Sequence, residues 1–284
     1  MATTVDEIEA RLLADPDDAA AWRAYVPWLR ERGDPRSELF ELDGIADTPH
    51  ERKALADQIQ ADRVAWTPTG MFTHDCTWRH GFAVGATFRI AGRSDARALA
   101  RMLADRHARL LGSLRLVFTT AVASRALADF EAADFSRLHE LRAGYHTRGS
   151  RVALALAAQP ALRLRTLDLR HTGLTDDALL ALATHPQIRA LQSLHLQHNR
   201  LTARSVAALA HSPALSGIEH LDLRDNQIGE PGAAALASSP HLGRLTALLV
   251  NAADLTRDGV RALAGSTALP RDIVRFWRAR DPTP

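Results

Sequence analysis

Three residues in the C-terminal half of the chain could bind a metal or move a proton. Asp168, His195 and Asp222 follow one another at a spacing of 27 residues. On neighbouring strands about 4.8 Å apart, the imidazole of His195 would lie between two carboxylates. Carboxylate and imidazole are good ligands for a divalent metal, and flanking carboxylates should raise the pKa of His195. A solvated, salt-linked row on a polar surface accounts for the same residues, and we favour it over a metal site.

A second group of residues could support thiol or metal chemistry: His74, Asp75, Cys76 and His80. A cysteine nucleophile needs a nearby base or cation, because the thiolate is the reactive form. The spacing H-x-C-x-x-x-H matches no strong metal pattern, and a lone cysteine between domains is more often a small packed residue. A Cys- or metal-dependent hydrolase is therefore the less favoured alternative.

The elements that position these residues follow from an apolar pattern that repeats every 27 residues, which is typical of a solenoid. The pattern Leu-x-x-Leu-x-Leu, with Ile or Val at some positions, occupies residues 164–169, 191–196, 218–223 and 245–250. Alternation predicts a short strand with its apolar side inward, and apolar residues at helical spacing follow each turn. Each unit should be a strand followed by a helix, and a proline ends the helix at Pro186, Pro213 and Pro240.

A turn residue completes the pattern. Asn199 and Asn226 lie three positions after the last leucine of their strands, where an amide can satisfy backbone groups that lose their ladder partners. The segment then reads L-x-x-L-x-L-x-x-N-x-L, which resembles the leucine-rich-repeat signature, and the helix in every unit makes it similar to the ribonuclease-inhibitor-like class. That resemblance implies a parallel sheet on the concave inner side of an arc, helices outside, and binding of another macromolecule.

Three weaker units extend the array toward the N-terminus, beginning at Phe82, Leu111 and Leu138. The first should be a strand over residues 82–90 and a helix from about 95 to 110. The second places Leu127 and Phe130 on its helix. Degenerate units are expected where a solenoid must cover its open ends.

Residues 1–66 lack the repeat and are predicted to form a small all-α domain, with helices near Val5–Leu13, Trp22–Arg32, Pro35–Leu42 and Pro49–Trp66. The residues Asp15-Pro16-x-Asp18 and Tyr25-x-x-Trp28-Leu29-x-Glu31-Arg32-Gly33-Asp34-Pro35 resemble the bacterial repeat-companion domain, which precedes repeat arrays. Pro27 stands where that family normally has Asp, and predicts a helix kink or a helix start. The resemblance implies an N-terminal cap or docking adaptor with no catalytic role.

We therefore predict an α/β leucine-rich-repeat solenoid preceded by this helical domain. The predicted organisation is a helical domain over 1–66, a junction over 67–81, about seven repeats over 82–270, and a cap helix with a tail over 271–284. Aromatic residues at helical spacing, such as Trp22 and Trp28, are more often core than binding anchors. A basic stripe near the first repeat helix is best explained by an exposed helix with Arg–Asp pairing; it comprises Arg97, Arg101, Arg106 and Arg109.

Composition favours an interaction protein of the cytoplasm. The 284 residues are 46% hydrophobic, without an apolar run of the ~20 residues that span a bilayer, and the N-terminus has no signal-peptide pattern. One cysteine suits a reducing compartment. With 35 basic against 33 acidic residues, net charge does not call for nucleic acid. We expect a protein partner, no nucleic acid, no membrane and no cofactor, and leave the oligomeric state open.

The inner face, which is the sheet surface opposite the helices, should hold the binding site. Its mixture of Arg and aromatic residues suits a protein partner. We expect a noncatalytic protein-protein interaction module; the alternative is a regulatory subunit, in which Arg170 or Arg224 acts on a partner protease or GTPase. The predicted partner-binding residues are Arg115, Phe118, Arg142, Tyr145, Asp168, Arg170, His171, His195, Gln197, His198, Asp222, Arg224, Asp225 and Asn251.

Overall fold

The structure of the protein is a computed structural model. It describes residues 4–38, 40, 62–119, 130, 133–186 and 188–281. Leu127, residues 39, 41 and 42 of the helix predicted over 35–42, and residues 49–61 of the helix predicted over 49–66 lie outside these ranges. Among the described residues, no helix combines the length and the apolar character needed to cross a bilayer.

One eight-stranded sheet runs through the repeat array in the order of the sequence. Its strands from β2 onward are parallel, and β1 pairs antiparallel with β2 at the N-terminal edge. The strands are β1 (Cys76–Arg79), β2 (Phe82–Ile90), β3 (Ser113–Phe118), β4 (Glu140–Arg142), β5 (Thr166–Asp168), β6 (Ser193–His195), β7 (His220–Asp222) and β8 (Ala247–Leu249).

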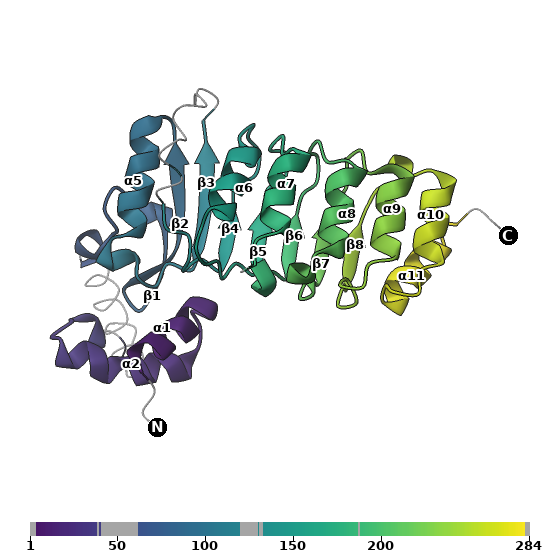
Figure 1. The fold of residues 1–284 in the computed structure, drawn as a ribbon. Helices are drawn as coiled ribbons and strands as arrows, with labels where there is room; N and C mark the ends of the chain where they lie inside the picture. Colours follow the sequence, from purple (N-terminus) through teal and green to yellow (C-terminus); the bar gives the residue numbers. More distant parts are fainter. Residues whose placement is uncertain are drawn as a thin grey trace.

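The repeat helices form a second layer along one side of this sheet (Figure 1). They are α5 (Arg93–Leu103), α6 (Gly149–Ala157), α7 (Asp176–Ala183), α8 (Ala203–His211), α9 (Gly229–Ala237) and α10 (Arg257–Ala264). The central leucine of each strand pairs with the same position of the next, as at Leu167, Leu194 and Leu221, and these side chains are at most 1% exposed. Parallel strands alternating with helices around one leucine core confirm the predicted α/β solenoid.

Asparagine amides connect adjacent units at the turns after the strands. The Asn199 side chain accepts a hydrogen bond from the Leu174 N–H at 2.9 Å and donates to the carbonyls of Leu169 and Leu196 at 2.9 and 2.8 Å. Asn226 donates to the carbonyls of Leu196 and Leu223, both at 3.0 Å. The predicted backbone role of these asparagines is confirmed, and each amide also holds the preceding unit in place.

Two helices at the N-terminus, α1 (Val5–Ala14) and α2 (Ala19–Glu31), pack against the start of the array. Trp22 of α2 is buried in one cluster with Phe82 and Val84 of β2, and Trp28 packs half-buried against the same cluster, which supports the assignment of both rings to the core. The helix α2 begins at Ala19 and continues through Pro27. The alternative that a helix starts at Pro27 is therefore wrong.

Two element boundaries near the first repeat differ from those predicted from the sequence. Residues 76–79, assigned to a junction, form β1, which turns into β2 through His80 and Gly81, both with positive φ. The helix predicted to reach residue 110 ends at Leu103. Asp105 then caps a separate 3₁₀ turn by accepting the His107 N–H, because a short acid at that position competes with continuation of the helix.

The C-terminal end of the core is covered by α11 (Arg271–Arg278). Ile273, Val274 and Trp277 of this helix are buried in the main core cluster, whereas Phe276 is 43% exposed. The helix therefore closes the apolar edge that the last repeat would otherwise expose to water.

We predict that Leu221→Ala lowers the free energy of unfolding by about 2–5 kcal/mol, because it leaves a cavity in the buried leucine row. The matched control is Leu249→Ala on the next strand, whose side chain is 39% exposed on the inner face and should cost no more than about 0.5 kcal/mol. Urea unfolding followed by circular dichroism measures both. Equal losses would contradict the register of the sheet.

Candidate functional site

The predicted row of polar residues forms on the inner face. Asp168 pairs in register with His195, and His195 pairs with Asp222. The row extends in both directions, because Arg142 is the partner of Asp168, Arg115 the partner of Arg142, and Leu249 the partner of Asp222. The predicted order of these side chains across the sheet is therefore confirmed.

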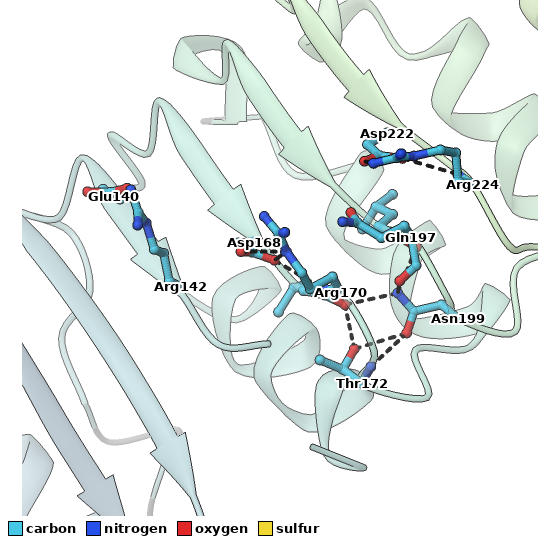
Figure 2. A network of polar contacts seen from close by, with 11 residues as sticks. Glu140, Arg142, Asp168, Arg170, Thr172, Gln197, Asn199, Asp222 and Arg224 are labelled. Atoms are coloured by element: carbon cyan, nitrogen blue, oxygen red, sulfur yellow. Dashed lines mark hydrogen bonds and ion pairs between the residues drawn. The ribbon is translucent and has the colours of Figure 1, made fainter. Parts of the chain in front are cut away.

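Ion pairs run along the strands of the inner face (Figure 2). Arg170 Nε lies 2.8 Å from Asp168 Oδ1, and Arg224 Nη2 lies 2.7 Å from Asp222 Oδ2. On β4, Arg142 is held in the same way by the carboxylate two residues before it, at 2.5 Å. Residues two apart on a strand project from the same face. Each acid therefore contacts the arginine two residues further along its own strand end.

Gln197 lies between two of these ion pairs (Figure 2). With its amide oriented to satisfy both neighbours, the nitrogen lies 3.2 Å from Asp222 Oδ2 and the oxygen lies 3.3 Å from Arg170 Nη1. Asp168, Gln197 and Asp222 are only 8%, 9% and 3% exposed. These three residues therefore act as a buried support that orients the arginines, and offer little surface to a partner.

The predicted rise in the pKa of His195 is wrong. Burial of the imidazole lowers its pKa, and although Asp168 and Asp222 act in the opposite direction, Arg170 opposes them. The net direction of the His195 pKa is downward because burial is the largest effect, and Arg170 and His220 add to it. Among the residues that the structure describes, no group of three or more His, Cys, Asp or Glu side chains is arranged to hold a metal ion.

A stack of rings lies where the strands end. Tyr145, His171, His198 and Asp225 all have positive φ, between 53° and 63°. The rings of Tyr145 and His171 stack with centroids 4.9 Å apart, and those of His171 and His198 at 4.2 Å. Asp225 holds the equivalent position on the next strand end, and its carboxylate accepts a 2.5 Å hydrogen bond from the side-chain amide of Asn251. These residues were predicted to face a partner, but nothing in their spacing indicated the left-handed backbone that stacks them.

A cavity of about 280 Å³ opens on the inner face between β3 and β5. Arg115, Phe118, Arg142, Tyr145 and Arg170 are among the residues that line it. Phe118 was predicted on the inner face, but it lies on the core side of β3 with Leu114 and Leu116, and its ring is 6.4 Å from that of Phe130. Arg115 and Arg142 are directly opposite on neighbouring strands, and like charges in this arrangement repel. Tyr145 is 65% exposed. Exposed arginines beside aromatic rings are the side-chain types that contribute most to protein interfaces.

The residues around Cys76 do not stabilise the thiolate that a cysteine nucleophile requires. Burial, and to a smaller extent Asp75, raise the pKa of the Cys76 thiol to about 11. The thiolate is therefore scarce at neutral pH. His74 lies at the surface, with its side chain 73% exposed, and contacts Asp75 at 3.9 Å. This environment favours the structural interpretation of Cys76 over the hydrolase alternative.

Comparison with known families identifies part of the array. A family model described as Leucine Rich repeat matches residues 164–183, 189–210 and 218–237. The segment 164–237 therefore consists of leucine-rich repeats, and spans β5 to α9 of the solenoid. The match does not include the N-terminal helices, so the resemblance to the repeat-companion domain stays a prediction. No curated protein matches the chain.

We predict that Arg170→Gln raises the pKa of His195. The substitution removes a cation that lowers the pKa of this histidine and frees the Asp168 carboxylate, which raises it. Titration of the imidazole by nuclear magnetic resonance measures the change, and Arg204→Gln on the outer helix α8 is the control. An unchanged or lower pKa in the Arg170 variant would show that the ion pair does not act on His195.

Proposed function

We propose that this chain is a noncatalytic protein-binding module that binds a protein partner through the inner face of the solenoid. Leucine-rich repeats suggest a protein-binding module, and repeats of this kind are typically noncatalytic. The observation that carries the proposal is the pair of exposed arginines, Arg115 and Arg142, that line one cavity with the exposed Tyr145 ring, on a sheet whose register is held by buried leucines. A preformed surface of this kind keeps the ordering cost of association low.

The inner-face residues divide into two groups in this proposal. Arg142, Tyr145 and Arg224 would contact the partner, since their side chains are 58%, 65% and 44% exposed respectively. Asp168 and Asp222 would hold the arginines in one geometry, because both acids are nearly covered. Fixing a guanidinium before binding reduces the side-chain entropy that association must overcome.

The alternative of a regulatory subunit requires an arginine to enter the active site of a partner enzyme. Arg170 and Arg224 are each bound to a carboxylate two residues away on their own strand. Transfer of either guanidinium would leave a buried acid without its partner, which is costly. Binding through the inner face needs no such rearrangement, so it is the function that we propose.

The N-terminal helices have a separate role in the proposal. Trp22, Tyr25 and Leu29 cover the apolar side of the first parallel strand around Phe82, as a cap on a solenoid must. We infer that residues 1–66 serve as the N-terminal cap of the array over 82–270, and that the protein works in the cytoplasm, where its single thiol stays reduced.

We predict that Arg142→Ala combined with Tyr145→Ala weakens partner binding about tenfold or more, because truncation of interface Arg and Tyr side chains often costs more than 1 kcal/mol each. Crosslinking capture from native lysate identifies the partner, and titration calorimetry with the purified partner measures the change in affinity. Thermal unfolding of each variant confirms that it is folded.

The matched control is Arg204→Ala combined with Arg275→Ala, which removes two exposed arginines from the helices α8 and α11. This variant should bind as the unaltered chain does. Binding that survives in the Arg142/Tyr145 variant but is lost in the control would move the interface to the helices and overturn the proposal.

A further inference from the structure

A second, strongly basic cavity lies between the N-terminal helices and the first repeat, away from the inner-face residues of β4 to β7. It has a volume of about 370 Å³. Its lining includes four guanidinium groups and one imidazole, with a single carboxylate among the described residues that line it. The cations are Arg32, Arg36, Arg106 and Arg109, the carboxylate is Asp34, and the rings of Trp28 and Trp66 form part of the wall.

Arg36 is the most buried cation of this cavity, at 5% exposure. Its Nε and Nη2 bind the Asp34 carboxylate at 2.8 and 2.5 Å, and its guanidinium lies 3.8 Å from the centre of the Phe82 ring. Its third nitrogen, Nη1, is buried without a hydrogen-bond partner among the described residues. A buried charged donor without an acceptor is costly, so the Arg36 guanidinium has a bonding capacity that Asp34 does not fill.

Asp34 cannot neutralise the cavity, because two arginines share it. Arg109 Nη2 lies 3.5 Å from the same Oδ2 atom that Arg36 binds. The Nε atom of Arg109 is buried without a hydrogen bond in the described structure, and Glu9 lies 3.8 Å from it. Arg32 stacks on Trp28 at 4.0 Å, and its nearest acid, Glu31, is 3.9 Å away with its side chain 76% exposed.

His107 also lines the cavity, and its pKa is lowered. Burial lowers the pKa of His107, and Arg36, Arg106 and Arg109 lower it further against the opposing effect of Asp105. A neutral His107 accepts a hydrogen bond from Arg106 at its Nε2 atom, so its proton is on Nδ1. That Nδ1 atom is also buried without a partner among the described residues, which gives the cavity another unused donor.

We propose that this cavity binds a phosphate group, as a phosphate monoester or free phosphate. Planar guanidinium groups bind phosphate oxygens in a bidentate geometry. The donors of Arg36, Arg109 and His107 that lack a partner in the described structure belong to residues that line the cavity. A phosphate dianion supplies more acceptors and more charge than a carboxylate, and among the described lining residues four guanidiniums face a single carboxylate. Phosphate therefore fits the cavity better than an Asp or Glu side chain does.

Inorganic phosphate is the first probe, added to the full chain at constant ionic strength. Binding should raise the unfolding temperature and change the tryptophan fluorescence, because Trp28 and Trp66 line the cavity. Arg32→Gln combined with Arg106→Gln should weaken phosphate binding about tenfold or more, since each lost contact is a charge-assisted hydrogen bond. Both arginines are exposed, so the double variant should stay folded.

Two further variants sharpen the test. Arg36→Lys keeps the charge but removes the Nη1 donor, and should also weaken binding. Arg204→Gln combined with Arg275→Gln removes two exposed arginines of outer helices and should bind phosphate normally. Phosphate also stabilises proteins generally by exclusion from their surfaces, but that effect would be equal in all variants. An equal gain in unfolding temperature in the Arg32/Arg106 variant would overturn the proposal.

A phosphoserine peptide distinguishes the two sources of the phosphate group. Tighter binding of the peptide than of inorganic phosphate would place the group on a phosphorylated protein, and the reverse order would indicate a small-molecule phosphate. Either result supports a phosphate site. The Arg142/Tyr145 variant of the inner face should retain phosphate binding in both assays, so this inference and the proposed function can fail independently.

Discussion

The burial of one leucine row between the sheet and its helices determines the rest of the molecule. Leu141, Leu167, Leu194, Leu221 and Leu248 pair in succession across five strands, and none is more than 3% exposed. A strand slipped by one residue would turn its leucines to water and its acids into the core. Asn199 and Asn226 oppose such a slip, because each amide binds backbone groups of two adjacent units.

Burial of the leucine row also determines where the polar side chains of the inner face lie. Residues that alternate with buried leucines must project away from the helices, so Asp168 and Arg170 share one surface. The acid can then hold the arginine, and Gln197 can join neighbouring pairs. Order on the inner face is therefore a consequence of order in the core, and a change in the leucine row would disturb both.

The parts of the structure that follow from local periodicity were accessible from the sequence, and those that depend on distant contacts were not. The register of Asp168, His195 and Asp222 follows from the 27-residue spacing. The direction of the His195 pKa does not, since it depends on burial and on Arg170. The strand β1 has four residues with no repeat to reveal it. The left-handed backbone at Tyr145 depends on the turn geometry of the assembled array.

The basic cavity could not be predicted from local periodicity, because its residues come from separate parts of the chain. Arg109 belongs to a stripe that the sequence assigned to an exposed helix, but the structure brings it to Asp34. Gly33, with φ of 62°, ends α2 and turns the chain so that Asp34 and Arg36 follow the helix closely. Gly81 passes Arg36 so closely that an added Cβ would lie 3.0 Å from its side chain.

This arrangement is hard to explain by capping alone. A cap must cover the apolar edge of the array, and Trp22, Tyr25 and Leu29 already do so against Phe82. An apolar residue in place of Arg36 would cover that edge without the desolvation cost of a buried ion pair, and such replacements are often neutral or stabilising. A buried guanidinium with one nitrogen unsatisfied among the described residues is therefore better explained by a ligand than by stability. The N-terminal helices would then cap the solenoid and bind an anion through the same few residues.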